Sequence, residues 1–405
     1  MKPIFITIQL LLISFSLSAQ IGRTYPDGHG GRVFFPFGDI SFADEVVEFQ
    51  VGDPGPIEGY GIPEPILGIP DYTGDFEKKY TTLGYGGSLT IKFTDNILYD
   101  IPGPDLYIFE IGPDVEPVEV HISKNGNDWI NVGKTGGGLS EVDISEYVNE
   151  SDIFRYVKIV DVKDGKSGRW PGADVDAIGA IGSSINFQLS SSVLFDFGKA
   201  TLGEDKTELK SIGEKVSEIN GLTVIEGYTD NVGSQESNID LSKRRAEEIR
   251  SYLINNHNID EGKIKVYAFG EKNPVADNTT EEGRSKNRRV EIIVFPNENE
   301  ERKGVVGTWD AGKWGDLHIY RYGDKIAGWY ESDGGEIVGE LTDPYTIEGK
   351  WVENGSRKEC DSYVYDRNHW GSLKLKFSKD YSTFTMFWGY CDSPADEKGL
   401  EGVKK

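Results

Sequence analysis

The sequence predicts a multidomain protein with an N-terminal all-β sandwich of the jelly-roll type, a central α/β domain and a C-terminal all-β meander or small barrel. Two observations carry this prediction. Residues 21–184 and 304–395 are rich in short segments that alternate apolar and polar residues, with glycine-containing turns between them. Residues 186–297 instead place strand-like runs between segments whose apolar residues recur every three or four positions. The polar segment 298–303 is predicted to be a linker.

The first residues are typical of a secretory signal. A positively charged start precedes an apolar run from Ile4 to Leu17, and small residues lead to Ala19. We therefore expect residues 1–19 to be removed on export. No cysteine follows, as a lipid-anchored signal would require, and no other apolar stretch approaches the length of a membrane-spanning helix.

Composition argues against two classes of function. The formal net charge is -25, which disfavours nucleic acid as a partner. The 5 histidines form no His-Glu-x-x-His cluster, and no Gly-x-Ser-x-Gly motif is present. We therefore expect no enzyme activity. An envelope glycoside hydrolase that uses two carboxylates is the least favoured of the alternatives that the sequence leaves open.

The first domain owes its predicted fold to four alternating segments, Leu89–Phe93, Leu106–Glu110, Val118–Ser123 and Tyr156–Val160. Asn125-Gly126 adds a hairpin signal. Short strands joined by turns at this spacing favour a sandwich.

Five acidic residues of this domain lie at strand ends or in glycine-containing loops, where calcium finds oxygen ligands. They are Asp105, Glu110, Asp161, Asp174 and Asp176. Asp174 and Asp176 are two residues apart, so an extended chain would place both carboxylates on one side. A structural calcium site is one expectation. The alternative is that these acids only end strands.

Three segments of this domain carry a weak resemblance to galactose-binding-like jelly-roll modules of secreted bacterial surface proteins. They run from Gly103 to Glu110, from Val120 to Trp129, and from Pro171 to Gly179. The resemblance implies the same sandwich.

The middle domain is predicted to follow the order β-α-β-α-β-α-β, with helices packed on one face of a sheet. The expected strands are Val193–Phe197, Leu222–Thr229, Ile264–Phe269 and Val290–Phe295, and the expected helices are Glu204–Ile219, one from Asn238 onward and a short one from Glu281. Residues 234–237 are expected to form a loop before the second helix.

Two side chains of this domain, Asp230 and Arg245, are unusual for their expected positions. On a helical wheel Arg245 falls within the apolar stripe that includes Leu241 and Ile249, and a buried guanidinium needs an anion. Asp230 ends the preceding strand. A carboxylate and a guanidinium held apart suit a zwitterionic ligand. The alternatives are that the two pair with each other, or that Asp230 caps a turn.

The motifs around these two residues resemble the OmpA-like peptidoglycan-binding domain. The first is Thr229-Asp230-x-x-Gly233 with Asn238-x-x-Leu241-Ser242-x-x-Arg245-Ala246, and the second extends from Phe269-Gly270-Glu271 to Asn287-Arg288-Arg289-Val290-Glu291. One mild departure is Ala268, where the family often has glycine.

The resemblance implies non-covalent binding of the diaminopimelate-type stem peptide of peptidoglycan. By position, Asp230 and Arg245 would be the primary ligands and Asn238 would line the same pocket. Arg284 and Arg288 also match the motif, and they would either bind the ligand or hold the last loop by ion pairs.

The predicted signal segment, taken with the resemblance, leads us to expect an exported protein that is periplasmic or peripherally associated with the outer membrane. The flanking β-domains would contact other envelope proteins or glycans. The main alternative is a secreted glycan-binding adhesin.

The last domain repeats Gly-x-Trp and Trp-Gly-x-Leu along short strands between Gly304 and Asp392, which favours a meander that closes into a small barrel. Its tryptophans would fill the core or, alternatively, form a ligand cavity or stacking platform. Both cysteines, Cys360 and Cys391, lie here, and in an exported chain a disulfide is expected rather than free thiols. A disulfide that closes a loop of this size would stabilise the folded chain by about 3–4 kcal/mol.

Overall fold

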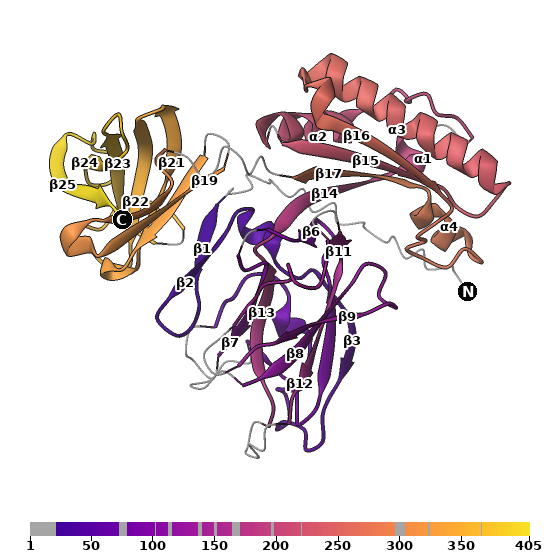
Figure 1. Ribbon diagram of the computed structural model, residues 1–405, viewed down its shortest axis with the longest axis horizontal. Coiled ribbons are helices and arrows are strands. Elements are labelled where there is room, and N and C mark those ends of the chain that lie inside the picture. Colours follow the sequence, from indigo (N-terminus) through magenta and orange to yellow (C-terminus); the bar gives the residue numbers. More distant parts are fainter. Residues whose placement is uncertain are drawn as a thin grey trace, which may run out of the picture.

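The computed structural model of the 405-residue chain is shown in Figure 1. It describes residues 22–405 except 73–78, 102, 112–115, 137–139, 150–151, 164–170, 196–197, 220, 296–303, 323–324 and 366. The predicted signal segment and linker therefore lie outside the described residues. Figure 1 shows three bodies: a β-sandwich, a helix-covered sheet above it and a barrel to one side.

Two antiparallel sheets form the N-terminal domain. The five-stranded sheet has the order β3 (Glu45–Gln50), β5 (Ser88–Lys92), β12 (Tyr156–Asp161), β8 (Val118–Ser123) and β9 (Ile130–Lys134). The four-stranded sheet has the order β10 (Glu141–Val142), β7 (Leu106–Glu110), β13 (Asp174–Ala180) and β4 (Thr81–Thr82). Buried residues of both sheets, such as Ile91 and Ile108, share one core. The four predicted strands and the hairpin at Asn125 are confirmed.

The sandwich and the middle domain share one six-stranded sheet. Its order is β11 (Ile153–Phe154), β6 (Asn96–Tyr99), β14 (Ser183–Ser190), β17 (Arg289–Phe295), β15 (Leu222–Tyr228) and β16 (Ile264–Gly270). The expected boundary near residue 185 falls within β14, which pairs with β6 on one side and with β17 on the other. The β strands of the two domains are therefore continuous at this point.

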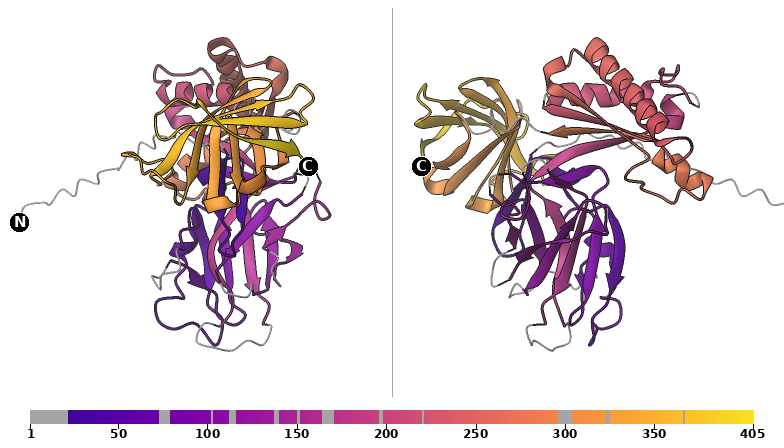
Figure 2. Two further views of the ribbon diagram at one scale, coloured as in Figure 1. Left: turned by 90° about the vertical axis from the view of Figure 1, so that its left-hand side faces the viewer. Right: turned by 45° about the vertical axis from the view of Figure 1, so that its right-hand side comes forward.

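Four helices belong to the middle domain: α1 (Ser191–Leu194), α2 (Thr207–Ile219), α3 (Gln235–His257) and α4 (Glu281–Asn287). Leu209 of α2 and Ile249 of α3 pack against Ile225 and Ile292 of the sheet. Figure 2 shows α2 and α3 on the same face of the sheet. The described elements follow the order β14-α1-α2-β15-α3-β16-α4-β17, so the predicted alternation is found from α2 onward, while the first strand is β14 and the additional helical turn α1 follows it.

Two predicted elements of this domain were wrong. Residues expected to form a strand from Val193 begin instead with the helical turn α1, and Phe195 makes only an isolated bridge to Leu202. Helix α3 begins at Gln235 rather than Asn238, because the Ser234 side chain accepts a hydrogen bond from Ser237 N and caps the first turn. Ser234 thus starts a helix where the polarity of residues 234–237 had indicated a loop.

The C-terminal domain is a closed antiparallel barrel of eight strands. They are β18 (Gly307–Asp310), β19 (Asp316–Tyr322), β20 (Lys325–Tyr330), β21 (Gly335–Asp343), β22 (Thr346–Glu353), β23 (His369–Phe377), β24 (Thr383–Trp388) and β25 (Glu397–Lys404). The barrel was expected to end near residue 395, but β25 closes it by pairing with β18 and β24. Trp309 and Trp351 fill its core, and Cys360 and Cys391 form the predicted disulfide.

The remaining short elements lie within the three bodies, and one hairpin contacts the barrel. The chain has 3-10 turns at Gly38–Ser41, Glu64–Ile66, Glu261–Lys263, Gly312–Trp314 and Ser332–Gly334. The hairpin β1 (Arg23–Pro26) and β2 (Arg32–Phe35) packs on the barrel, where Phe34 stacks on Tyr320 with ring centroids 4.0 Å apart. Among the described residues, no helix combines the length and apolarity needed to cross a membrane.

Candidate ligand-binding site in the α/β domain

Close packing of α3 against β15 positions the candidate site. A Cβ atom on Gly227 would lie 2.2 Å from the Ser242 carbonyl oxygen, so only glycine allows this approach. Ser242 is buried, and its hydroxyl accepts a hydrogen bond from Gly270 N at 3.1 Å. The chain leaving β15 and the middle of α3 are thereby held side by side.

Asp230 follows β15 directly, and both oxygens of its buried carboxylate have partners. Oδ1 accepts a hydrogen bond from Val232 N at 3.0 Å. Oδ2 accepts one from Arg288 Nη1 at 2.7 Å. The partner of this carboxylate is therefore Arg288, and the alternative in which Asp230 and Arg245 pair with each other is not what the structure contains.

Arg245 lies on the buried face of α3, as its place in the apolar stripe predicted, and is 4% exposed. Its Nε donates to the Lys199 carbonyl at 3.0 Å, and its guanidinium carbon lies 5.2 Å from the Phe195 ring centroid. No carboxylate of a described residue forms an ion pair with it. Burial lowers the pKa of Arg245 first and the charge of Arg288 lowers it further, while Asp230 opposes both.

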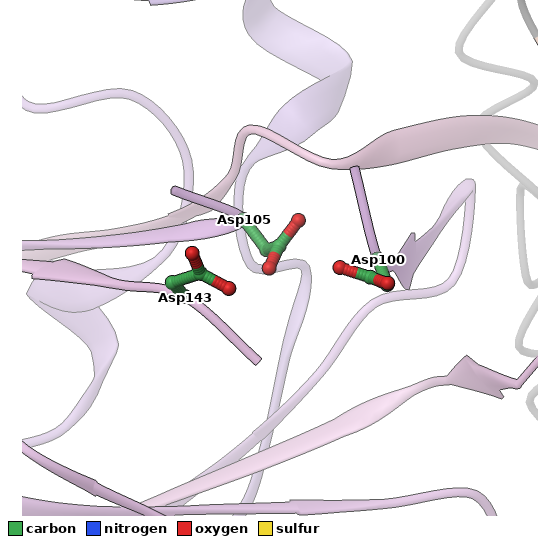
Figure 3. Close-up of side chains that lie close together, drawn as sticks. All are labelled: Asp100, Asp105 and Asp143. Atoms are coloured by element: carbon green, nitrogen blue, oxygen red, sulfur yellow. The ribbon is translucent and has the colours of Figure 1, made fainter. Parts of the chain in front are cut away.

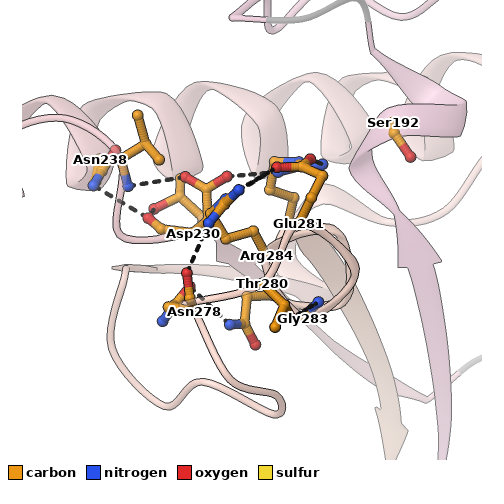
Figure 4. A network of polar contacts seen from close by, with 12 residues as sticks. Ser192, Asp230, Asn238, Asn278, Thr280, Glu281, Gly283 and Arg284 are labelled. Carbon is orange, nitrogen blue, oxygen red and sulfur yellow. Dashed lines mark hydrogen bonds and ion pairs between the residues drawn. The ribbon is translucent and has the colours of Figure 1, made fainter.

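Asn238 holds the loop that carries Asp230. Its Nδ2 donates to the Asp230 carbonyl oxygen at 3.3 Å and to Glu271 Oε2 at 2.7 Å. Figure 4 shows Asn238 at one end of α3, beside Asp230. Asn238 is buried, so it fixes the site's backbone.

Arg284 and Arg288 project from the end of α4 and share one acid, Glu281. Arg288 Nη2 lies 2.8 Å from Glu281 Oε1, while Arg284 Nε and Nη2 lie 3.0 and 2.8 Å from Glu281 Oε2. Arg284 also donates to the Asn278 carbonyl at 3.0 Å. Arg284 therefore holds the loop before α4, whereas Arg288 reaches Asp230 itself.

Sequence reasoning missed Glu281. It lies three and seven residues before the two arginines, a spacing that places all three on one helical face. Its pKa is lowered by the hydrogen bonds from Arg288 and Arg284. The resulting arrangement has three guanidiniums, Arg245, Arg284 and Arg288, and two carboxylates, Asp230 and Glu281. Both carboxylates pair with Arg284 or Arg288, which leaves the positive charge of Arg245 available for an anion.

Residues 194–288 match the family model described as OmpA family. These residues form an OmpA-family domain. The domain is similar to part of the outer membrane porin F of Pseudomonas aeruginosa, at 39% identity over 124 residues, which are 30% of this chain and 35% of that protein. It is also similar to the peptidoglycan-binding protein ArfA of Mycobacterium tuberculosis, at 38% identity over 114 residues, 28% of this chain and 35% of that protein.

A further match is the probable lipoprotein YiaD of Escherichia coli, at 35% identity over 117 residues, 28% of this chain and 53% of that protein. The chain thus spans between about a third and a half of the length of these relatives. Among solved structures, the cell wall anchor of the T6SS from Pseudomonas aeruginosa is 28% identical, with a TM-score of 0.26, over 28% of this chain and 82% of that one.

Outside the OmpA-family domain, the five predicted calcium ligands are not brought together. Asp161 accepts hydrogen bonds from Gly86 N and Lys163 N, Asp174 from the Thr82 hydroxyl and Asp176 from Tyr72 N. Glu110 ends β7 with its side chain buried. Asp174 and Asp176 share β13, but among the described residues no three of the five come close enough to hold one cation.

Asp105 alone among the five belongs to a cluster of acids. Its carboxylate lies with those of Asp100 and Asp143, with ligand atoms within 4.8 Å of one another (Figure 3). Asp105 is fully buried and accepts hydrogen bonds from Ile101 N at 2.6 Å and Ile144 N at 2.8 Å. Burial raises the pKa of Asp105 to about 7 against these two bonds. Calcium stays a prediction for this domain.

Proposed function

We propose that the OmpA-family domain binds peptidoglycan non-covalently, through the diaminopimelate-type stem peptide. The observation that carries the proposal is the buried guanidinium of Arg245, which has no ion pair with a carboxylate of the described residues and lies near Asp230 and Arg288. An unpaired buried charge is costly for folding, and a ligand carboxylate removes that cost. The relative named for peptidoglycan binding, ArfA, supports the same ligand.

Each end of the zwitterion has a place in this proposal. The ligand carboxylate binds Arg245, whose planar guanidinium suits a two-oxygen acceptor. The ligand ammonium binds Asp230. Arg288 uses one oxygen of Asp230, but a carboxylate offers about four lone-pair positions, so the ammonium can bind without displacing Arg288.

The cellular role follows from this binding. The protein would anchor or link envelope components to the cell wall, in the periplasm or at the periphery of the outer membrane. The sandwich and the barrel would supply contacts to other envelope proteins or glycans. The named relatives are an outer membrane porin, a lipoprotein and a peptidoglycan-binding protein, so binding is favoured over catalysis.

Sedimentation with purified diaminopimelate-type peptidoglycan tests the proposal. The chain should pellet with the polymer, and Asp230→Ala or Arg245→Ala should leave it in the supernatant. Arg244→Ala is the matched control, because Arg244 is the exposed neighbour of Arg245 and pairs only with Asp240 at 2.8 Å. Full binding by Arg245→Ala, or loss with Arg244→Ala alone, would contradict the proposed site.

A further inference from the structure

A cleft of about 1770 Å³ lies between the OmpA-family sheet and the sandwich. One wall is the sheet face opposite α2 and α3, with Tyr228 of β15, Tyr267 of β16 and Glu291 of β17. The other wall belongs to the sandwich and includes Arg155 and Tyr156. In Figure 1 this sheet face is directed toward the sandwich. The cleft therefore lies on the other side of the sheet from the helix α3 that carries Arg245.

Buried ion pairs fix the two walls relative to each other. Arg155 of the sandwich pairs with Glu291, which also accepts from Arg289 Nε at 2.6 Å. The Arg289 guanidinium lies 3.7 Å from the Tyr228 ring centroid, and Tyr228 donates to Glu226 at 2.6 Å. Because breaking a buried pair is costly, this network holds the cleft in a defined shape.

The wall of the cleft also contains a buried amide side chain. Asn186 of β14 lines the cleft and is 5% exposed, and its Nδ2 donates to the Thr94 carbonyl at 3.0 Å. Its Oδ1 has no hydrogen-bond partner among the described residues. This oxygen is closed to solvent, so it lies beneath the cleft surface and is not itself a ligand contact.

Aromatic and polar side chains lie along the edge strand β16 and the adjacent rim. Tyr267 is 48% exposed although it is large and apolar in part, and Lys265 beside it on the same face is also exposed. Phe269 stacks on Tyr228, with centroids 5.2 Å apart. Gln188 of β14 is exposed at the cleft. Aromatic planes with a few placed polar groups are the usual lining of a ligand site.

We infer that this cleft binds a carbohydrate chain, and specifically the glycan strand of the cell wall, whose amino sugars present hydroxyl and amide donors and flat apolar faces. A sugar face would lie against the exposed Tyr267, and a sugar hydroxyl or N-acetyl group would form a hydrogen bond with the exposed Gln188 amide. The inference rests on the proposed function for the choice of glycan. The segment from α4 to β17 joins the two sites, because Lys286 and Arg289 line the cleft while Arg288 holds Asp230.

Calorimetric titration of the full chain with two probes tests this inference. The first is peptide-free glycan strands prepared from peptidoglycan with an amidase, and the second is the free stem peptide. Tyr267→Ala and Gln188→Ala change exposed side chains, so both should fold. Tyr363→Ala, which removes a tyrosine 69% exposed on the barrel, is the control.

The wild type should bind the glycan strands. Tyr267→Ala should weaken that binding by roughly three- to tenfold, the range expected for one aromatic contact, and should leave stem-peptide binding unchanged. Asp230→Ala should show the reverse. Two results would overturn the inference that the cleft binds glycan. One is no binding of glycan strands by the wild type, and the other is equal binding by the Tyr267→Ala, Gln188→Ala and Tyr363→Ala proteins. Glycan binding without stem-peptide binding would instead overturn the proposed function alone.

Discussion

Arg288 Nη1 lies 2.7 Å from Asp230 Oδ2, so the acid expected to face a ligand ammonium already has a basic partner, and that partner is not Arg245. The same arginine is held by Glu281 on its other side. The two arginines are therefore neutralised unequally. Arg288 forms ion pairs with two carboxylates, whereas Arg245 has only the electrostatic attraction of the more distant Asp230. The positive charge left over at Arg245 is the basis of anion binding in this account.

Replacing Arg288 should destabilise the OmpA-family domain. In Arg288→Gln, Asp230 and Glu281 both lose a charged partner, and Asp230 is buried. We expect a loss of about 2–4 kcal/mol in the free energy of unfolding. Urea denaturation of the full chain measures it. Arg244→Gln, which loses only an exposed pair with Asp240, should cost less than about 0.5 kcal/mol. Equal losses in the two variants would contradict this role for Arg288.

The barrel should loosen from the rest of the chain when Glu336 is replaced. This buried acid of β21 pairs with Arg32 of the β1–β2 hairpin and with Arg367 of the barrel. Glu336→Gln leaves two largely buried guanidiniums without a carboxylate, at a cost of about 3 kcal/mol. Small-angle X-ray scattering should show a larger radius of gyration. Glu348→Gln is the control, because Glu348 pairs with Lys374 at the surface of the barrel. An unchanged radius of gyration in both variants would show that Glu336 does not hold the hairpin to the barrel.

The sandwich should become more stable as the pH falls from 7 toward 4. Burial raises the pKa of Asp105 to about 7, whereas an unfolded aspartate titrates near 3.9. Between these values the folded chain holds a proton that the unfolded chain has lost, so stability decreases as the pH rises, by up to about 1.4 kcal/mol per pH unit. Burial also raises the pKa of Asp176 to about 7, so this residue should likewise make the stability decrease as the pH rises.

Urea unfolding at pH 5, 6, 7 and 8 measures this dependence. Asp105→Asn removes the titrating group, so its slope with pH should be smaller than that of the wild type, whatever its stability at a single pH. A wild-type stability that rises from pH 5 to pH 7, or an unchanged slope in Asp105→Asn, would show that burial does not control this carboxyl.

Calcium binding to the sandwich remains a prediction, now centred on Asp100, Asp105 and Asp143 instead of the five acids expected at first. Three carboxylates that share one cation lose their mutual repulsion, so millimolar calcium should raise the melting temperature of the sandwich. Differential scanning calorimetry with calcium and with a chelator measures the shift. A melting temperature that is the same in both conditions would contradict calcium binding at these three acids.

Local patterns were enough to predict part of this structure. The burial of Arg245 followed from helical periodicity alone, and the disulfide followed from having two cysteines in one domain of a chain that is expected to be exported. The closed barrel followed from repeated short strands, but its last strand, Glu397–Lys404, was missed because six of its eight residues are charged or glycine and most of them are exposed.

Long-range relationships could not be predicted in the same way. The pair of Arg155 and Glu291 joins residues 136 positions apart, and the partner of Asp230 depends on how α4 is oriented. Nothing local indicates that β14 continues from one domain into the next. The sequence of residues 234–237 favours a loop and a helix start alike, because serine hydroxyls suit both, and the cap that Ser234 forms on α3 decides between them.

The central claim is that Arg245 recognises the carboxylate of a zwitterion, and titration calorimetry with two tripeptides tests it most directly. One ends in diaminopimelate, and the other has lysine there, which keeps the ammonium and lacks the neighbouring carboxylate. The wild type should bind the diaminopimelate peptide at least about tenfold more tightly, as one charge-assisted contact requires, and Arg245→Ala should lose the preference. Equal affinity of the wild type for the two peptides would contradict the claim.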